Sequence, residues 1–367
     1  MKVLMFSADP TILDAGSSAA KRMIEYGRRV EKLDILALTP HLATGYPSEV
    51  WLAENTRVRA FDGRLSRFFK AFFVAWQMAG REKYDLLVAQ DIEHAFVCWL
   101  LGGKWQMQIH SDIFSPYFTR HSVFNKIRVM LAKFLIPRAF CVRAVSERIK
   151  NSIKNEFNLE AKLPSIVVLP ILPVLMDLTA EPKRFSEFAK TILMVSRLTS
   201  EKNVGLAIDA MAEVLKKHPK VGLIIVGDGS ERESLELKAK SYKLQANVKF
   251  EGWQNDTVPY YKGADIFLLT SWYEGWGMSA VEAMRYGAAV VMADVGLAGE
   301  VVEDGKTGLI VPVGDKNALV GAILRLLEDE ELRRSLIKEV AKKVQELPYA
   351  EMYYQRMVEL WQKCVNS

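Results

Sequence analysis

Two glutamates frame a short glycine-containing stretch in the second half of the chain. Glu274 and Glu282 stand eight positions apart in the segment SWYEGWGMSAVEAM, with Gly275 and Gly277 between them. Glycine lacks a Cβ atom, so the backbone here can approach a ligand closely. A helix expected to begin near Ser279 would turn free N–H groups and a partial positive charge towards a phosphate. A carboxylate on either side of such a site could hold sugar hydroxyls, which suits a nucleotide sugar.

The same residues also have a simpler interpretation. Ser279 and Glu282 form the S-x-x-E pattern of a capping box, in which the serine caps a helix and the glutamate folds back onto it. A capping box needs no ligand, but it accounts for neither Glu274 nor the two glycines. The chemical interpretation is therefore preferred.

These residues follow one of many short apolar runs that alternate with amphipathic segments. Continuous apolar strands separated by helices are typical of a parallel sheet covered on both faces. The runs of the first half are 3–7, 34–38, 85–89, 105–109, 139–144 and 165–169, with helical patterns over 17–30, 65–80 and 123–136. Those of the second half are 192–196, 222–227, 248–252, 266–270, 289–293 and 309–312. The sequence therefore predicts an α/β fold with a doubly wound sheet in each half.

A proline-containing stretch, 169–190, separates the two halves and is interpreted as a linker. The predicted domains span 1–175 and 185–345, and the tail of 350–367 is a predicted amphipathic helix. Ligands of open parallel sheets bind beyond the carboxyl ends of the strands. We therefore expect the chemistry to face a cleft between the domains.

Composition and cysteine usage indicate a globular protein. The 367 residues are 50% hydrophobic and 25% charged, and the net charge of +5 suits an anionic ligand or membrane surface; no nucleic acid is predicted as a partner. No apolar run approaches the roughly 18 residues of a membrane span, and the opening MKVLMFSADP lacks a cleavage site, so no signal peptide is expected. Cys98, Cys141 and Cys364 show neither metal-ligand spacing nor a disulfide framework, which indicates a reducing compartment.

Several segments of the second half together resemble the retaining glycosyltransferases of family 4, which have the GT-B fold. Glu274 and Glu282 match the E-x7-E pattern of that family, and VSRLTSEKNV looks like its Arg-x4-Lys segment, with Arg197 and Lys202. Further segments that resemble the family are IIVGDGSERESL (224–235), VKFEGW (248–253) and GEVVEDGKTGLIVPVGD (299–315). The resemblance covers almost all of the second half and is looser in the first. It implies two Rossmann-like domains that face a cleft, with the C-terminal helix crossing back to the first domain.

The resemblance also implies roles for particular residues. Glu282 would hold the ribose hydroxyls, and Glu274 would contact the donor sugar. Arg197 and Lys202 would hold the leaving phosphates, where negative charge develops and where preorganised cations lower the barrier most. The other implied donor-binding positions are Gly275, Trp276, Gly277, Met278, Ser279, Gly227 and Trp253.

Two positions in the first half are assigned on the same basis. His110 comes just after a predicted strand, and the family often has a histidine there that touches the donor sugar. An isolated histidine is more often structural, but Ser111 and Asp112 after it make a polar loop, which favours function. Gly16 lies in the first loop, where the family has a glycine pair beside the diphosphate. Only one glycine of that pair is present, so the phosphate role of Gly16 stays open.

The predicted reaction is transfer of a hexose-type sugar from a nucleoside diphosphate, with a UDP-sugar favoured, to a hydroxyl of a glycan or lipid-linked acceptor. Retention of the anomeric configuration is expected, by a front-face reaction or through a covalent intermediate. No D-x-D motif occurs, so no metal or other cofactor is predicted, and Arg197, Lys202 and the helix N-terminus would supply the metal's charge. Two alternatives stay open: a nucleotide-sugar epimerase of similar architecture, and a non-catalytic protein that binds a nucleotide sugar.

Two segments of the first half, 64–83 and 119–138, combine cations with apolar and aromatic residues. Helices of this composition can lie in the interface of a bilayer. The alternative is that the aromatic residues face the domain core and the cations form a solvated rim. The prediction is a cytoplasmic protein attached peripherally to the anionic inner face of the cytoplasmic membrane.

Overall fold

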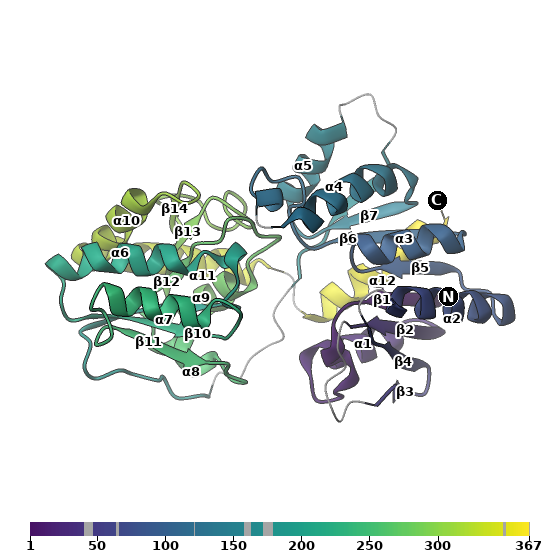
Figure 1. Cartoon of the computed structure of the whole chain (residues 1–367), viewed down its shortest axis with the longest axis horizontal. Coiled ribbons are helices and arrows are strands. Elements are labelled where there is room, and N and C mark those ends of the chain that lie inside the picture. Colours follow the sequence, from purple (N-terminus) through teal and green to yellow (C-terminus); the bar gives the residue numbers. More distant parts are fainter. Residues whose placement is uncertain are drawn as a thin grey trace. The chain divides into compact units, whose positions relative to one another are not determined.

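The computed structural model describes residues 1–39, 47–63, 66–120, 122–157, 163–171, 179–347 and 350–366. Part of the predicted linker and Arg64 of the basic segment lie outside these residues. The chain divides into two compact units: Met1–Phe114 with Ser122–Val174 and Tyr349–Ser367, and Ser115–His121 with Leu175–Pro348. Figure 1 shows that each unit has a sheet of its own. The first unit therefore contains both ends of the chain.

The described part of the first unit holds an eight-stranded sheet of order β3-β4-β2-β1-β5-β6-β7-β8. Its strands are β1 Lys2–Ser7, β2 Lys32–Leu38, β3 Glu49–Ala53, β4 Thr56–Phe61, β5 Leu86–Ala89, β6 Trp105–Ile109, β7 Cys141–Ala144 and β8 Ser165–Val168. All neighbouring strands are parallel except β3 and β4. The central strands are covered on both faces, so their side chains are buried almost throughout. All six apolar runs of the first half are strands.

The antiparallel edge hairpin of β3 and β4 is not predicted by the sequence. Its strands carry charged residues, and Arg59 Nε lies 2.7 Å from Glu49 Oε2 across the pair. The guanidinium of Arg57 lies over the half-exposed ring of Trp51. A partly solvated edge strand has no continuous apolar run. The described sheet is therefore parallel as predicted, except for this antiparallel edge pair.

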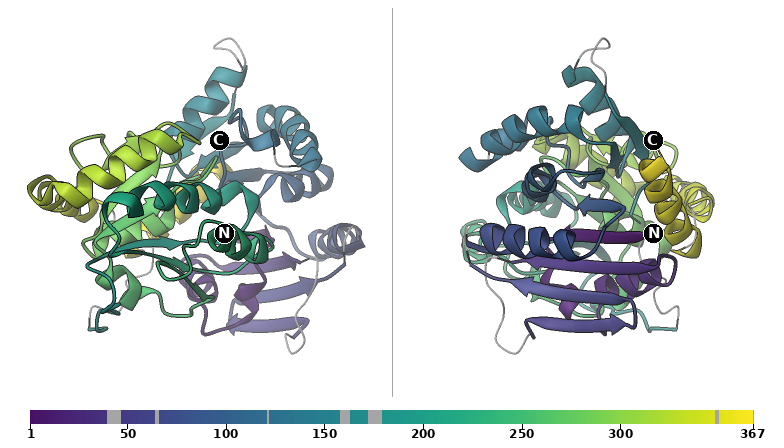
Figure 2. Two further views of the ribbon diagram at one scale, coloured as in Figure 1. Left: turned by 60° about the vertical axis from the view of Figure 1, so that its left-hand side comes forward. Right: turned by 90° about the vertical axis from the view of Figure 1, so that its right-hand side faces the viewer.

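Helices cover both faces of the first sheet. The helices are α1 Ser18–Gly27, α2 Ser66–Arg81, α3 Ile92–Leu101, α4 Val123–Leu135, α5 Glu147–Phe157 and α12 Ala350–Asn366, with short 3-10 turns η1 Pro10–Leu13 and η3 Ile136–Arg138. Helices α2, α3 and α4 lie on one face, and α1 and α12 lie on the other (Figures 1 and 2). Among the described residues, no helix is long and apolar enough to cross a membrane.

The C-terminal helix α12 packs on the sheet of the first unit. Trp361 is fully buried there, and its Nε1 donates a hydrogen bond of 3.1 Å to Gln106 Oε1 on β6. Near the other end of the helix, the hydroxyls of Tyr353 and Tyr26 lie 3.1 Å apart. Arg143 of β7 donates to the Tyr353 hydroxyl over the same distance. These contacts make the end of the chain part of the first unit.

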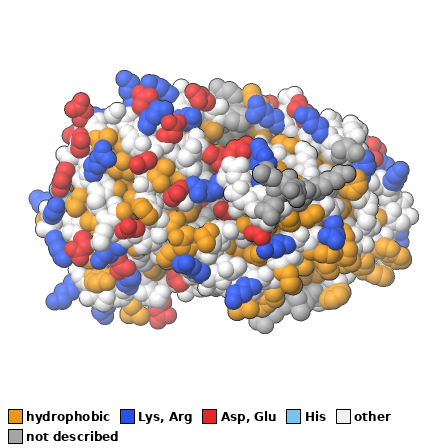
Figure 3. Space-filling view, turned by 90° about the horizontal axis from the view of Figure 1, so that it is seen from above, with side chains coloured by type: hydrophobic (Ala, Val, Ile, Leu, Met, Phe, Trp, Pro, Cys, Tyr) orange, Lys and Arg blue, Asp and Glu red, His pale blue; other side chains and the backbone are white. Residues whose placement is uncertain are grey.

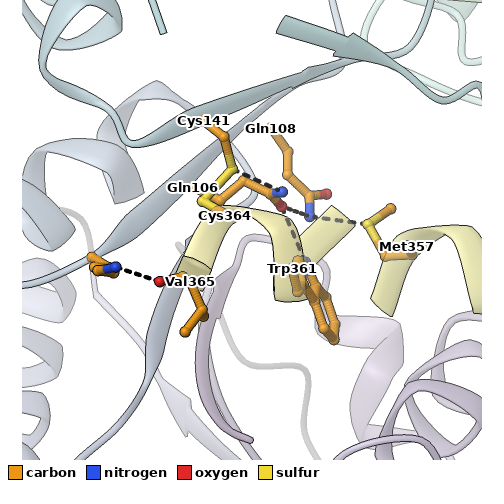
Figure 4. Close-up of a disulfide and its surroundings, with 8 residues drawn as sticks. Gln106, Gln108, Cys141, Met357, Trp361, Cys364 and Val365 are labelled. Atoms are coloured by element: carbon orange, nitrogen blue, oxygen red, sulfur yellow. Dashed lines mark hydrogen bonds between the residues drawn. A yellow bond between two sulfur atoms is a disulfide. The ribbon is translucent and has the colours of Figure 1, made fainter. Parts of the chain in front are cut away.

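Cys141 of β7 and Cys364 of α12 form a disulfide, with their Cα atoms 5.7 Å apart (Figure 4). The expectation that the cysteines form no disulfide is therefore wrong. The pair is separated by 223 positions, and only the return of α12 to the sheet brings the two residues together. Cys98 is a buried free thiol, and burial raises its pKa. The inference of a reducing compartment loses its basis, and a cytoplasmic location stays a prediction.

In the second unit, the described residues form a six-stranded parallel sheet of order β11-β10-β9-β12-β13-β14. Its strands are β9 Lys190–Val195, β10 Val221–Val226, β11 Val248–Gly252, β12 Ile266–Leu269, β13 Ala289–Ala293 and β14 Leu309–Val311. Its helices are α6 Val204–Lys217, α7 Arg232–Ser241, α8 Val258–Gly263, α9 Met278–Arg285, α10 Lys316–Glu328 and α11 Glu330–Gln345. All six apolar runs of the second half are strands.

The winding of the second sheet reverses between β9 and β12. From β9 the chain proceeds to β10 and β11 on one side, and then returns to place β12, β13 and β14 on the other. The loops after β9 and β12 therefore diverge at the carboxyl edge of the sheet. In open α/β sheets this divergence is where ligands bind.

Candidate active site

The residues of the two charged motifs lie at the point where the second sheet reverses. Arg197 follows β9, and Lys202 ends the short 3-10 turn η4 Ser200–Lys202 after the same strand. Glu274 lies in the loop after β12. The structure therefore brings the Arg-x4-Lys segment and the first glutamate of E-x7-E to neighbouring strand ends.

Lys202 and Glu274 form a direct ion pair. Lys202 Nζ lies 2.6 Å from Glu274 Oε1, and the two side chains are only 17% and 14% exposed. The hydroxyl of Ser271 donates to the same carboxylate oxygen over 2.8 Å. Ion pairs of low exposure lose less of their attraction to solvent than surface pairs do. The carboxylate is thus held in one position by a cation and a hydroxyl.

Backbone contacts join the two loops that carry this pair. Thr270 Oγ1 donates to the carbonyls of Lys202 and Asn203 at 3.1 and 3.0 Å. The N–H of Trp272 donates to the carbonyl of Glu201 at 2.9 Å. The position of Lys202 relative to Glu274 is therefore set by the main chain as well as by charge.

Arg197 is the exposed cation of the site. Its side chain is 68% exposed, and its Nη2 lies 3.2 Å from Glu201 Oε1. Burial favours the neutral form of Glu201, but hydrogen bonds, chiefly from Thr199, and nearby cations outweigh it and lower the pKa of Glu201. Glu201 is therefore ionised at neutral pH. Glu201 was not predicted from the sequence, although its position four after Arg197 is the spacing of a helical ion pair.

The glycine-containing loop leads into helix α9, which begins at Met278, next to Ser279 as predicted. Gly277 is the N-cap, with φ of 101° and no side-chain cap. The capping-box interpretation is therefore wrong, because a left-handed glycine and not Ser279 starts the helix. The first amides of a helix have no acceptor within it. The N–H groups at Met278 and Ser279 are accordingly the donors that this loop offers to an anion.

Glu282 is the fifth residue of α9. Its Oε2 accepts a hydrogen bond of 2.7 Å from the hydroxyl of Tyr261, a residue of α8 that the sequence analysis missed. Burial raises the pKa of Glu282, against the opposing effects of Tyr261 and Arg285. One hydroxyl uses only part of the acceptor capacity of a carboxylate. Glu282 can therefore accept hydrogen bonds from further hydroxyl groups.

Three buried donors around these loops lack a hydrogen-bond partner within the described part of the chain. They are the Ser196 hydroxyl, the Asn203 side-chain amide and the Trp276 indole N–H. Ser196 and Asn203 flank the Arg-x4-Lys segment, and Trp276 lies between the two glycines. A buried donor without a partner costs about 1–3 kcal/mol, so such groups call for a partner such as a ligand or water.

The remaining donor-binding positions of the second unit differ in character. Gly227 has φ of 132°, and a Cβ atom there would lie 1.9 Å from the carbonyl oxygen of Ser196. Only glycine allows this close approach of the two loops. Trp253 is 69% exposed, and its Nε1 donates to Asn255 over 3.2 Å. Gly227 therefore shapes the edge of the sheet, while Trp253 offers an open aromatic surface.

A short segment from the first half of the sequence adds aromatic residues to this unit. Tyr117 and Trp272 have ring centroids 5.5 Å apart, and Phe118 meets Tyr273 edge-on at 5.1 Å. Phe118 begins the 3-10 turn η2 Phe118–Arg120. These contacts were not predicted from the sequence, because the segment lies far from the loop of Glu274 along the chain.

His110 and Gly16 belong to the first unit, whereas all other predicted site residues belong to the second. His110 directly follows β6 and is partly exposed. Burial, together with the positive charges of Arg143 and Arg22, lowers the pKa of His110 to about 3, so the ring is neutral at physiological pH. The N–H of Gly16 donates to Asp14 Oδ1 at 2.9 Å, ahead of Ser17, which caps α1.

Comparison with known proteins decides the family. The family described as "Glycosyl transferases group 1" matches residues 178–343. N-acetyl-alpha-D-glucosaminyl L-malate synthase from Bacillus anthracis is 30% identical over 281 residues, which cover 74% of this chain and 72% of that protein. The chain belongs to the group 1 glycosyltransferases. The prediction of a glycosyltransferase is thereby confirmed.

Other relatives of this glycosyltransferase align over shorter stretches. Alpha-D-kanosaminyltransferase from Streptomyces kanamyceticus is 26% identical over 66% of this chain and 66% of that protein. LpsE of Rhizobium meliloti, a lipopolysaccharide core biosynthesis glycosyltransferase, is 31% identical over 40% of this chain and 42% of that protein. The chain thus spans no more than about two thirds of these two relatives.

Solved structures share the fold of this glycosyltransferase. Sucrose-phosphate synthase from Thermosynechococcus elongatus matches with a TM-score of 0.80 and 21% identity over 99% of each chain. HepE of Anabaena, in complex with UDP and glucose, matches with a TM-score of 0.73 and 21% identity over 99% of this chain and 100% of that one. The likeness confirms the predicted GT-B fold with two parallel-sheet α/β domains.

Proposed function

We propose that this glycosyltransferase is a retaining enzyme of family 4 that moves a hexose-type sugar from a nucleoside-diphosphate sugar to an acceptor hydroxyl. The observation that carries the proposal is the Lys202–Glu274 pair at the reversal of the second sheet. It places a cation for phosphate beside a carboxylate for sugar hydroxyls, at the edge where such sheets bind ligands. In this proposal Glu274 and Lys202 belong to the E-x7-E and Arg-x4-Lys motifs of the family.

The donor would enter by exchanging partners with this ion pair. A diphosphate competes with Glu274 for Lys202 Nζ, and the released carboxylate is then free to accept hydroxyls of the sugar. Arg197, which is largely exposed, and the first amides of α9 would share the negative charge of the departing diphosphate. These groups supply the charge stabilisation for which other transferases use a metal, so we propose metal-independent transfer.

Glu282 would hold the ribose. The carboxylate is partly buried and accepts one hydrogen bond from Tyr261, so two ribose hydroxyls can use its remaining acceptor capacity. We propose a UDP-sugar as donor, which is supported by the UDP and glucose bound in the HepE structure. A cell-surface glycan or glycolipid acceptor is supported by the role of LpsE in lipopolysaccharide core biosynthesis. His110, neutral because of its low pKa, would touch the donor sugar from the first unit.

In the transfer, the anomeric carbon exchanges its bond to the phosphate oxygen for a bond to the acceptor oxygen. The acceptor hydroxyl loses its proton, and the departing phosphate oxygen is an available base for it. Preorganised cations at that oxygen stabilise the charge that develops as the bond breaks.

The test is incubation of the purified protein with a panel of nucleotide sugars, with and without glycan or lipid acceptors. Nucleotide release that depends on acceptor, with the sugar attached in the donor's anomeric configuration, is the expected result. Conversion of the donor to an isomer without acceptor would instead show an epimerase. Tight binding without any turnover across the panel would show a binding protein.

A further inference from the structure

Large apolar side chains stand in solvent along three helices of the first unit. Phe69 on α2 is 75% exposed, and Phe124 and Met130 on α4 are 73% and 65% exposed. Helix α3 adds the exposed residues Phe96 and Leu100. Contiguous apolar patches are rare on soluble monomers and mark sites of interaction. The alternative that the aromatic residues of 64–83 and 119–138 face the domain core is therefore wrong for Phe69 and Phe124.

The three helices form one continuous surface, which we call the apolar helix face. Helix α3 contacts both α2 and α4, and the ring of Trp99 on α3 meets that of Phe134 on α4 at 5.0 Å. All three helices cover the side of the sheet opposite α1 and α12 (Figure 2). Figure 3 shows hydrophobic side chains gathered over the first unit at its lower right edge, with lysines and arginines among them.

The charged side chains of α2 and α4 have one sign. Neither α2 nor α4 contains an aspartate or a glutamate, and their cations are Arg67, Lys70, Arg81, Lys126, Arg128 and Lys133. Lys126 is exposed between Phe124 and Ile127, which are themselves exposed. The guanidinium of Arg138, just beyond α4, lies 3.8 Å from the ring centroid of Phe134. Cations therefore stand directly among the exposed aromatic residues.

Some of these cations are balanced by acids from neighbouring elements. Arg128 pairs with Glu93 of α3 and Lys133 with Glu156 of α5, both at 2.5 Å. Lys70 lies 3.7 Å from Asp62, in the loop before α2. The pairs lower the net positive charge of the face without placing an acid on α2 or α4 themselves.

We propose that the apolar helix face docks on the surface of an anionic lipid bilayer. Aromatic and aliphatic side chains that project among cations can enter the region between headgroups and acyl chains, while the cations meet lipid phosphates. Contact with a bilayer explains both features together. Apolar burial alone would not require the cations, and charge attraction alone would not require the exposed phenylalanines. The proposal stands independently of the donor and acceptor assigned above.

A second copy of the chain fits this face less well. A two-fold symmetric dimer brings the same surface of each subunit against itself. The cations of α2 and α4 would then meet each other, with no acid on either helix to pair with them. Like charges across an interface are unfavourable. The sign of the charge therefore favours an anionic partner over self-association.

The experiment is flotation of the full-length protein with vesicles of phosphatidylglycerol and phosphatidylcholine, and with phosphatidylcholine alone, at low and high salt. We expect flotation with the anionic vesicles only, weakened by salt. The double variant Phe124→Ser/Met130→Ser should lose more than about tenfold in partition coefficient. The matched control is Leu237→Ser on α7, which is 59% exposed on the second unit and should float like the wild type.

A charge variant separates attraction from apolar insertion. Lys126→Gln should lower the partition coefficient about fivefold, whereas Lys217→Gln on α6, another exposed lysine, should leave it unchanged. All four variants change exposed side chains, so their melting temperatures should match that of the wild type. If the double variant melts lower than the wild type, Ile127→Ser takes its place. If Lys126→Gln melts lower, Lys126→Ser takes its place.

Two results would overturn the proposal. One is protein that stays with the soluble fraction under all vesicle and salt conditions. The other is flotation that Phe124→Ser/Met130→Ser leaves unchanged. Light scattering after size exclusion adds a third outcome: a wild-type dimer that becomes a monomer in this double variant would show that the face joins two copies of the chain.

Discussion

The two units of the chain have related sheets but different surfaces and interiors. Within the described residues, the second unit exposes few large apolar side chains, namely Leu237, Tyr242 and Trp253. The first unit exposes them along three adjacent helices. In the second unit the buried donors without a partner, Ser196, Asn203 and Trp276, lie in the loops at the carboxyl edge of the sheet, where a ligand can satisfy them. The comparison teaches that one sheet architecture can carry a site for a small polar ligand in one unit and an extended apolar surface in the other.

The interiors differ as well. The core cluster of the second unit consists of apolar, non-aromatic side chains from one face of the sheet and from the helices that cover it. Under α12, the first unit instead buries Arg143, which is 1% exposed and donates to the Leu169 carbonyl, Gln108 and Tyr353. These acceptors are neutral. Burial of His110 and, after it, the positive charge of Arg143 lower the pKa of His110. The first unit thus uses a polar layer where the second uses apolar packing.

The largest expected effect tests the dependence of the first unit on its last helix. Trp361→Ala removes a fully buried indole and its hydrogen bond to Gln106. Loss of a buried tryptophan typically costs about 3–5 kcal/mol. Denaturant unfolding should show a first unit weakened by that amount and an unchanged second unit. Unfolding of both units to the same extent would contradict their independence.

The next effect concerns the cations that the second unit offers to the leaving diphosphate. Lys202→Ala should lower kcat on the order of a hundredfold, because one preorganised charge stabiliser is lost. Arg197→Ala should act in the same direction. Lys217→Ala, an exposed lysine of α6, serves as the control and should keep full activity. Chelation by EDTA should leave the wild-type rate unchanged, and inhibition reversed by magnesium or manganese would refute metal-independent transfer.

Substitutions of Glu282 and Glu274 should impair different steps. Glu282→Gln should weaken nucleotide binding by about 1.5–3 kcal/mol, measured by calorimetry. Its melting temperature should not fall, because burial raises the pKa of Glu282 and the buried charge is unfavourable to the folded state. Protonation removes the charge of Glu282, so the affinity of the wild type for nucleotide should fall as pH drops through that raised pKa. Glu282→Gln has no charge to lose here and should show no such fall.

Glu274→Gln should lower turnover more than binding. Removal of this carboxylate frees Lys202, which it holds at 2.6 Å, so affinity for UDP should be equal or higher. Measured kcat should fall, since the group that orients the sugar is lost. Equal losses of UDP affinity in both glutamate variants, with turnover intact, would contradict the assigned roles.

The last effect concerns the pH dependence of the stability of the first unit. His110 stays neutral in the folded state down to a pKa of about 3, whereas an unfolded histidine binds a proton near pH 6.5. The unfolded state therefore gains the proton first, and His110 makes the folded state less stable as pH falls from 6 to 4. The slope is about 1.4 kcal/mol per pH unit. Urea unfolding of His110→Gln beside the wild type should show this slope reduced.

The sequence predicted the strands that are covered on both faces, because continuous apolar runs identify them. The hairpin of β3 and β4 was not predicted, because its half-solvated strands carry charges and contain no continuous apolar run. The disulfide between Cys141 and Cys364 was not predicted either, because the spacing of cysteines along the chain does not show that α12 returns to the first sheet. Motif matching assigned Lys202 and Glu274 to one site, and the structure adds their direct contact. Motif matching could not identify Tyr261 or Glu201 as site residues. Neither is a defining residue of a motif, and each reaches its partner through local packing.

The disulfide between β7 and α12 makes the backbone from Cys141 to Cys364 a closed covalent ring. Residues 179–347, the larger described part of the second unit, all lie within this ring. One cut in any exposed loop of that stretch opens the ring but leaves both fragments attached through the sulfur atoms. A protease would therefore need two cuts, or one cut and a reductant, to release a piece of the glycosyltransferase.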